Sequence, residues 1–150
     1  IVVHLLNQEV NKGDREMQFK ECYQNPFIEE RADPYITLGP DGFYYFTASY
    51  PMKSADDKDG YDRVILRRAK DISELASAEE ITIWKVADTT LTHRFIWAPE
   101  LHYIAGRWYV FYAGSEDKEN NWAFDCHVLV CDSYDPYTGT WSEKGKFQKS

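Results

Sequence analysis

The stretch DPYITLGPDGFYYFTAS, residues 33–49, is the part of the sequence that predicts the fold. An extended apolar run leads through Gly-Pro-Asp-Gly into an aromatic run, and links of this kind join the strands of β-hairpins. A second stretch of the same kind, ELHYIAGRWYVFYAG, occupies residues 100–114 and turns at Ala-Gly. The sequence therefore predicts two related hairpins, each of which opens with an acidic residue.

The similarity between the two stretches continues along the chain. A shift of 64 residues places Gly42 on Gly106 and Tyr45 on Tyr109. The same shift places RVILRRAKD, which begins at Arg63, on HVLVCDSYD. Both segments are rich in branched apolar residues and read as strands. Each repeat therefore contains a third strand after its hairpin.

A fourth strand is predicted in each repeat, at residues 81–86 and 139–147. The match slips by seven residues at this point, so that Trp84 corresponds to Trp141. The extra residues of the first repeat, 71–80, contain an Asp followed three positions later by Glu, a capping box that predicts a short helical turn. Four antiparallel strands in roughly 65 residues are typical of one blade of a β-propeller.

The predicted fold class is therefore all-β: a partial β-propeller of two four-stranded antiparallel blades. Propellers close with about 4–8 blades, so two blades leave strand edges and apolar faces uncovered. We expect residues 25–150 to be the first two blades of a truncated propeller domain, and residues 1–24 to be an N-terminal extension without an assigned place. Further blades, or a second copy of the chain, would cover the open faces. A truncated relic of a propeller is the third alternative.

The composition limits the partners of the chain. A formal net charge of −8 over 150 residues disfavours nucleic acid, and no apolar run approaches the roughly 20 residues of a membrane span. Aromatic residues make up 16%, and Tyr and Trp rings can stack on sugars as well as fill a core. The location of the protein stays open. Three cysteines and no leader-like segment favour the cytoplasm over secretion, without excluding secretion.

Two carboxylates begin the first strand of each repeat, Asp33 and Glu100. First strands line the axis of a propeller, so both side chains are expected to point toward one central pocket. Asp33 precedes Pro34, which favours an extended backbone. Such acids suit the binding of sugar hydroxyls or a cation, or acid–base chemistry at a glycosidic bond. The alternative for Asp33 is an aspartate that caps a turn.

A second candidate motif is HRFIWAPEL, residues 93–101. Trp97 is expected just before the strand that carries Glu100, where it forms either the wall of an axial pocket or part of the core between blades. His93 and His102 lie in the same region. A lone histidine is more often structural than functional, and His102 alternates with Leu101 as a sheet residue would.

The motifs in combination resemble glycoside hydrolase family 43, and in particular its α-L-arabinofuranosidase-like members. The resemblance runs from Asn25 to about Phe147, and RADPYI and WAPELHY are its most specific parts. The segments that carry it, in chain order, are NPFIEERADPYI, YYFTASYP, DRVILRRAKD, IWAPELHYIAGRWYVFYA and DPYTGTWSEKGKF.

The resemblance implies a five-bladed propeller that cleaves arabinose or xylose linkages with inversion. It implies that Asp33 is the general base, that Glu100 supports the pocket, and that Trp97 lies near the sugar. Tyr50 in YYFTASYP and His93 are further candidates for binding an arabinose- or xylose-containing oligosaccharide. The other two catalytic acids belong to later blades, so no hydrolysis is expected from these 150 residues alone. No cofactor and no metal site are expected in this chain, and a non-catalytic sugar-binding propeller is the alternative function.

Overall fold

The computed structural model describes residues 25–53, 60–88, 94–116 and 122–147, and they form two four-stranded antiparallel sheets. The first sheet contains β1 (Ala32–Leu38), β2 (Tyr44–Ser49), β3 (Arg63–Ala69) and β4 (Ile81–Lys85), in chain order. The second contains β5 (Arg94–Ile104), β6 (Arg107–Ser115), β7 (Phe124–Cys131) and β8 (Trp141–Lys146). The predicted all-β class and both sets of four strands are confirmed. The predicted extension at residues 1–24 lies outside the described residues.

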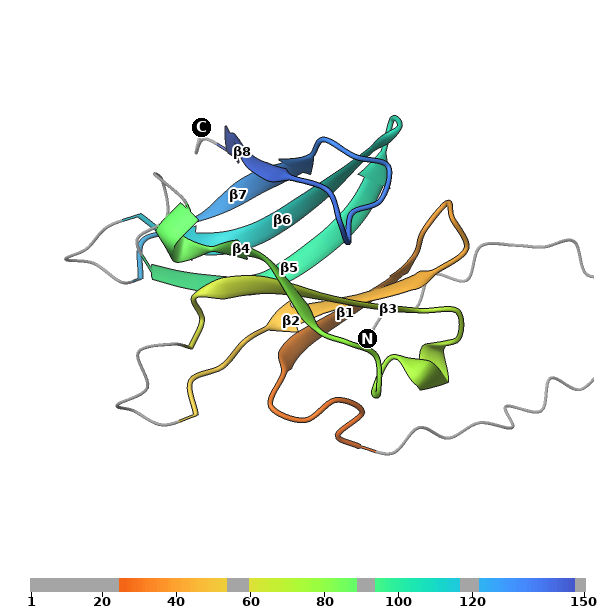
Figure 1. Cartoon of the computed structure of the whole chain (residues 1–150). Coiled ribbons are helices and arrows are strands. Elements are labelled where there is room, and N and C mark those ends of the chain that lie inside the picture. Colours follow the sequence, from red (N-terminus) through yellow and green to blue (C-terminus); the bar gives the residue numbers. More distant parts are fainter. Residues whose placement is uncertain (1–24, 54–59, 89–93, 117–121, 148–150) are drawn as a thin grey trace, which may run out of the picture.

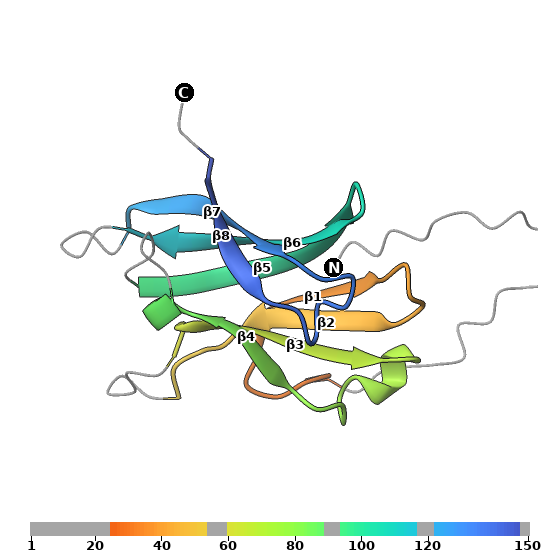
Figure 2. The same ribbon diagram turned by 45° about the horizontal axis from the view of Figure 1, so that its top comes forward.

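The sheets are stacked, with β5 of the second sheet lying next to β1 and β2 of the first (Figure 1, Figure 2). Consecutive strands pair with each other in both sheets, which gives each sheet the meander of a propeller blade. Within the described ranges, no helix is long and apolar enough to cross a membrane.

The two predicted hairpins are present, but their turns differ in length. Residues 39–43 separate the paired Leu38 and Tyr44, whereas four residues, 104–107, separate the equivalent pair of Tyr103 and Trp108. Ile104 and Arg107 also pair with each other, so the second turn itself consists of Ala105 and Gly106. The second turn has positive φ at Ala105 (49°) and at Gly106 (84°). Positive φ at both central residues is the requirement of the type I′ turn, whose twist matches that of the strands.

The predicted helical turn is a short 3-10 helix, η1 (Ile72–Glu74), and a second one, η2 (Val86–Asp88), follows β4. The side chain of Asp71 caps η1 by accepting hydrogen bonds from the backbone N–H and the hydroxyl of Ser73, at 2.8 and 2.6 Å. Asp71 therefore acts as the N-cap that the sequence predicts.

The main hydrophobic core lies between the two sheets. Alternate residues of β2 and β3 face the second sheet, and β6 and β7 supply the opposing side chains. Tyr45 and Trp108, both almost fully buried, meet there with ring centroids 5.1 Å apart. The other core residues are Val64, Leu66, Trp84, Ile96, Leu101, Val110, Tyr112, Leu129, Cys131 and Trp141. Burial of this apolar area is the main attraction that holds one sheet on the other.

The predicted match between Trp84 and Trp141 is wrong. Trp84 pairs with Val64, and the equivalent residue Val128 pairs with Gly145 rather than with Trp141. The connections before the two fourth strands differ in length, so the tryptophans occupy different positions in their sheets. Both are nevertheless buried in the core between the sheets.

The outer faces of the stack differ. On the far side of the first sheet, Phe46 and Ile65 are buried together with Ile28 and Leu75. This flank is therefore covered, contrary to the expectation that both flanks are open. The far side of the second sheet carries the rings of Tyr109, Phe111 and Phe147, which stack in series, and Phe147 is 59% exposed.

Candidate active site

Asp33 lies at a β-bulge near the start of β1. The pairing of β1 with β2 is regular from Tyr35 onward, but it shifts between Ala32 and Tyr35. Asp33 has φ of 51°, in the left-handed region, so the extended backbone expected before Pro34 is wrong. A non-glycine residue in this region costs on the order of 1–3 kcal/mol, and such strain is often found at functional sites. The bulge interrupts the ladder and leaves the Asp33 side chain exposed.

The second sheet repeats this bulge. The shift in the pairing of β5 with β6 falls between Trp97 and Glu100, and Ala98 there has φ of 46° and precedes Pro99. Two strained residues before prolines therefore occupy the same place in the two sheets. The equivalent of Asp33 in the second sheet is Ala98.

Glu100 does not correspond to Asp33, and this expectation from the sequence is corrected. Glu100 pairs with Phe111, and Tyr35 pairs with Thr47, which the repeat matches to Phe111. The equivalent of Glu100 is therefore Tyr35. Asp33 was matched to Glu100 because both are acidic residues at the start of a strand, whereas the pairing places Ala98, two residues before Glu100, at the position of Asp33.

The carboxylate of Asp33 is held by Ser49, the last residue of β2. Ser49 Oγ donates a hydrogen bond to Asp33 Oδ2 at 2.9 Å and accepts one from the Ala98 N–H at 2.8 Å. Ser49 is completely buried, whereas Asp33 is exposed. One hydroxyl thus connects the strained residue of the first sheet to the strained residue of the second.

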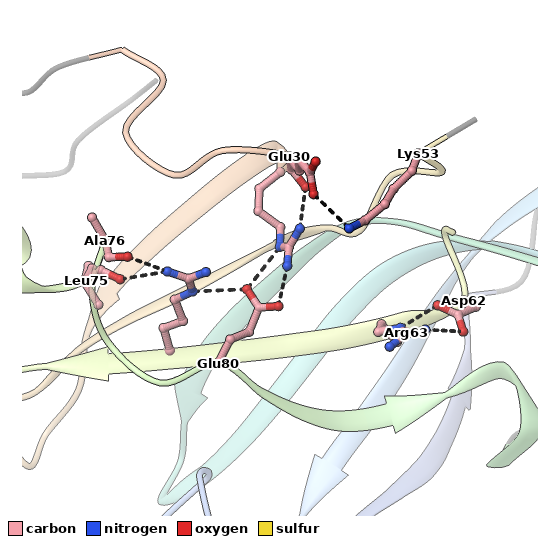
Figure 3. Close-up of polar contacts among 9 residues, drawn as sticks. Glu30, Lys53, Asp62, Arg63, Leu75, Ala76 and Glu80 are labelled. Carbon is pink, nitrogen blue, oxygen red and sulfur yellow. Dashed lines mark hydrogen bonds and ion pairs between the residues drawn. The ribbon is translucent and has the colours of Figure 1, made fainter. Parts of the chain in front are cut away.

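A charged network fixes the chain just before Asp33. Arg31 donates hydrogen bonds to both carboxylate oxygens of Glu80, from Nε at 3.0 Å and from Nη2 at 2.5 Å, and Arg67 donates from Nε at 3.1 Å. Figure 3 shows Glu80 at the centre of these contacts. Burial would raise the pKa of Glu80, but the hydrogen bonds and charges of Arg31 and then Arg67 hold it below its ordinary value. The ionised carboxylate therefore ties Arg31 to the residues before β4.

Tyr50, a predicted sugar-binding residue, follows Ser49 and lies against two cations. The guanidinium carbons of Arg31 and Arg63 are 4.2 and 4.4 Å from the centre of its ring. Cation–π contacts of this kind anchor the ring within the protein. The ring of Tyr50 is therefore engaged by arginines in this structure.

Glu100 belongs to a polar group between β1 and β5. Its Oε2 lies 3.0 Å from Nε2 of His102, and Nδ1 of His102 lies 3.5 Å from the Tyr35 hydroxyl. Burial, and to a smaller extent the charge of Glu100, raises the pKa of Tyr35. Asp33 and Glu100 thus have different hydrogen-bond partners, Ser49 and His102.

Trp97 lies within β5 rather than before it, and it is the centre of an aromatic cluster. Its ring stacks on Phe124 at 4.4 Å, and Tyr61 and Trp122 approach it edge-on at 5.6 and 6.1 Å. Trp122 is 78% exposed. Since Trp97 directly precedes Ala98, this cluster lies next to the backbone that Ser49 contacts.

The remaining candidates give less information. His93 lies outside the described residues. Two surface hollows, one lined by Val128 and residues 144–147 and the other by residues around Gly106 and Tyr134, include neither Asp33 nor Glu100. In the part of the chain that the structure describes, no three His, Cys, Asp or Glu side chains are grouped as a metal site.

Sequence reasoning missed Ser49, the role of the Ala98 backbone, and the Arg31–Glu80 contact. The sequence could have indicated that Ser49 faces the second sheet, because it alternates with Tyr45 on the same side of β2. The contact of Arg31 with Glu80 had none, because no pattern in the sequence joins residues so far apart.

The described residues thus form two stacked four-stranded meanders, with an exposed carboxylate at a strained bulge in the first sheet and an aromatic cluster around Trp97 next to the bulge in the second. A sequence profile described as glycosyl hydrolases family 43 matches residues 23–150. The chain belongs to this family.

Three relatives illustrate the similarity. The chain is 43% identical over 124 residues to the extracellular exo-α-(1→5)-L-arabinofuranosidase of Streptomyces avermitilis, covering 83% of this chain and 24% of the relative. It is 42% identical over 126 residues to α-L-arabinofuranosidase 43 of Humicola insolens, covering 84% of this chain and 24% of the relative. The crystal structure of α-L-arabinofuranosidase from Lactobacillus brevis matches with a TM-score of 0.70 and 40% identity, covering 84% of this chain and 39% of that chain. The chain thus spans about a quarter of the curated relatives named here.

Proposed function

We propose that these residues form the first two blades of an inverting β-propeller glycosidase that removes terminal α-L-arabinofuranosyl groups from plant polysaccharides or oligosaccharides. Membership of family 43 and the 43% identity to an arabinofuranosidase support the substrate class. A β-xylosyl linkage is the second substrate that the proposal allows. The observation that carries the catalytic assignment is the exposed carboxylate of Asp33, fixed by Ser49 at a strained bulge.

The surface of the second sheet supports the proposal of further blades, five in the complete ring. The first sheet turns Tyr45 toward its neighbour and buries it, whereas the equivalent Tyr109 lies on a partly exposed face with Phe111 and Phe147. A third blade would cover these rings as the second sheet covers Tyr45. The greater length of the relatives is consistent with such additional blades.

In the proposed reaction, a water molecule attacks the anomeric carbon from the face opposite the leaving group. Asp33, ionised, takes a proton from this water as the C–O bond to the leaving sugar breaks. A carboxylic acid on the other side gives its proton to the departing oxygen. Inverting enzymes separate the two carboxyl groups by roughly 6.5–9.5 Å so that the water fits between them.

The general acid and the carboxylate that tunes it are assigned to blades beyond this chain. We therefore propose that residues 1–150 alone do not hydrolyse the substrate. Trp97 and Glu100 are proposed to contact the sugar, with His93 as a further candidate. Tyr50 is proposed to contact the substrate only at the edge of the site, because two arginine guanidinium groups already lie over its ring.

A second candidate function is sugar binding without hydrolysis, and the aromatic cluster favours it. Trp122 is 78% exposed beside Trp97, and exposed aromatic rings stack on sugars without any need for catalytic acids. The rest of the reading frame separates the two functions. Acidic residues at the catalytic positions of the later blades favour hydrolysis, and their replacement favours binding alone.

The location of the protein is a separate question. The Streptomyces avermitilis relative is described as extracellular, which does not favour the cytoplasmic setting expected from the cysteines. Cys126 and Cys131 are both free thiols, the first exposed and the second buried.

The test uses an aryl α-L-arabinofuranoside with four proteins: residues 1–150 and the full-length protein, each with and without Asp33→Asn. We expect turnover only from the full-length protein, with a loss of about 10²–10⁴-fold in kcat on substitution. NMR of the first product should show inversion at the anomeric carbon. Turnover by residues 1–150 that disappears with Asp33→Asn would contradict the proposed need for later blades. An unchanged kcat in full-length Asp33→Asn would remove Asp33 from the mechanism.

A further inference from the structure

A single buried hydroxyl connects the proposed base to the neighbouring sheet. Ser49 Oγ accepts the N–H of Ala98 in β5 and donates to Asp33 Oδ2 in β1. We infer that Ser49 is the positioning residue for Asp33, and that through it the proposed base is aligned only when the second sheet is docked on the first. This inference rests on the proposed function of Asp33.

The geometry leaves the hydroxyl little freedom. Ser49 is 0% exposed, so no bulk water competes for its hydrogen. One lone pair of Oγ is used by the Ala98 N–H, which restricts the direction in which the O–H can point. The acceptor in that direction is the Asp33 carboxylate. The hydrogen bond therefore fixes the direction of the Asp33 carboxylate, and a general base has to point at the group from which it takes a proton.

The second sheet provides an internal comparison. It repeats the strained residue before proline, with Ala98 in place of Asp33. It also repeats the position that pairs with the residue just before the bulge, where Ala113 stands in place of Ser49. The bulge therefore forms without a carboxylate and without a hydroxyl. The Asp–Ser pair is an addition to the first sheet that the backbone itself does not require.

The bond from Ala98 gives the arrangement its dependence on the second sheet. Ala98 has no side-chain function, but its N–H is presented by the strained bulge in β5. Because this N–H orients Ser49, a change in the packing of β5 against β1 and β2 alters the direction of the Asp33 carboxylate. The strained backbone at Ala98 in the second sheet thus helps to orient the Asp33 carboxylate in the first.

The experiment uses the full-length protein with Ser49→Ala, which installs the residue that the second sheet has at this place. We expect kcat to fall by at least about tenfold, since small displacements of a reacting group are costly, while KM changes by less than about twofold. Ser49→Thr, which keeps the hydroxyl, should restore kcat.

The matched control is Thr47→Val. Thr47 lies on the same face of β2 and is 1% exposed, and its hydroxyl has no hydrogen-bond partner in the described part of the chain. This variant should leave kcat and KM unchanged. Thermal unfolding measures the folded fraction of every variant, and kcat is corrected for it. A purely structural role of Ser49 would lower this fraction and leave the corrected kcat unchanged.

The outcomes separate the inference from the proposed function. If Asp33→Asn abolishes turnover while Ser49→Ala leaves the corrected kcat unchanged, the inference is wrong and the base assignment stands. The same conclusion follows if Thr47→Val lowers kcat as much as Ser49→Ala does. If Asp33→Asn retains full activity, the base assignment fails first, and the inference fails with it.

Discussion

Replacing Glu80 by glutamine tests whether the network before Asp33 stabilises the fold. Glu80 accepts hydrogen bonds from Arg31 at 2.5 and 3.0 Å and from Arg67 at 3.1 Å. Glutamine keeps the volume but removes the charge, and its amide group can present only one oxygen to the two guanidinium groups. The substitution therefore leaves two arginines inadequately paired.

The size of the effect follows from the exposure of the three side chains. Removing one partner of a fully buried ion pair costs about 3–5 kcal/mol, and a hydrogen bond to a charged group contributes about 1.5–3 kcal/mol. The side chains of Arg31, Arg67 and Glu80 are 11%, 15% and 18% exposed, so water reaches them in part. We expect Glu80→Gln to lower the free energy of unfolding by about 2 kcal/mol at pH 7.

The pH dependence gives this prediction its sharpest form. The pKa of Glu80 in the folded protein is below its ordinary value, which is about 4.3 in an unfolded chain. The carboxylate therefore contributes stability above that value, and the contribution is lost as pH falls through the folded pKa. The difference between wild type and Glu80→Gln should be largest at pH 7 and should shrink below about pH 4.

Urea denaturation followed by tryptophan fluorescence measures the difference. Glu79→Gln is the control, because it makes the same change of charge at an adjacent exposed glutamate whose carboxylate forms no ion pair among the described residues. A loss below about 0.5 kcal/mol for Glu80→Gln, the range of ordinary surface substitutions, would refute the reasoning. So would a difference that stays constant between pH 7 and pH 3.5.

Two further predictions concern other parts of the molecule. In the full-length protein, Trp97→Ala should raise KM for the arabinofuranoside by about tenfold, because it removes the central ring of the aromatic cluster, whereas Trp97→Phe should retain most of the affinity; an unchanged KM in folded Trp97→Ala would exclude contact with the sugar. The buried His127 has a pKa lowered by burial, an effect that the charge of Glu116 opposes in part. The unfolded chain therefore takes up a proton below about pH 6.5 that the folded chain resists, so stability should fall as pH drops from 7.5 to 5.5. His127→Gln should flatten this dependence in urea titrations, and an unaltered slope would show that another group is responsible.

The architecture was predictable because local patterns specify it. Alternating apolar residues, aromatic strands and Gly-containing turns place all eight strands, and the repeat identifies two similar sheets. Asp71 was predictable as a helix cap for the same reason, since its partner Ser73 is two residues away.

The register of the site was not predictable to the same degree. A shift of 64 residues is correct for the strand that carries Tyr45, but the longer turn at residues 39–43 displaces the strand before it. As a result, an ungapped shift of 64 residues places Asp33 on Trp97, one residue before its true equivalent, Ala98. Glu100 was matched to Asp33 because both are acidic, although chemical likeness does not determine position in a ladder.

The contacts that orient Asp33 were beyond sequence reasoning for a different reason. Ser49 and Ala98 meet only because two sheets stack, and the contact depends on a backbone N–H that carries no signal in the sequence. The positive φ of Asp33 was likewise hidden, since the rule for residues before proline favours an extended conformation. Such exceptions to local rules are expected where function or strain overrides them.

The strained bulge that occurs twice also matters for the redesign of the molecule. Ala98 and Ala113 occupy in the second sheet the positions that Asp33 and Ser49 occupy in the first, with the backbone already bent into the same conformation. A designer who places Asp and Ser there would begin with the backbone in place and would need to supply only the side chains.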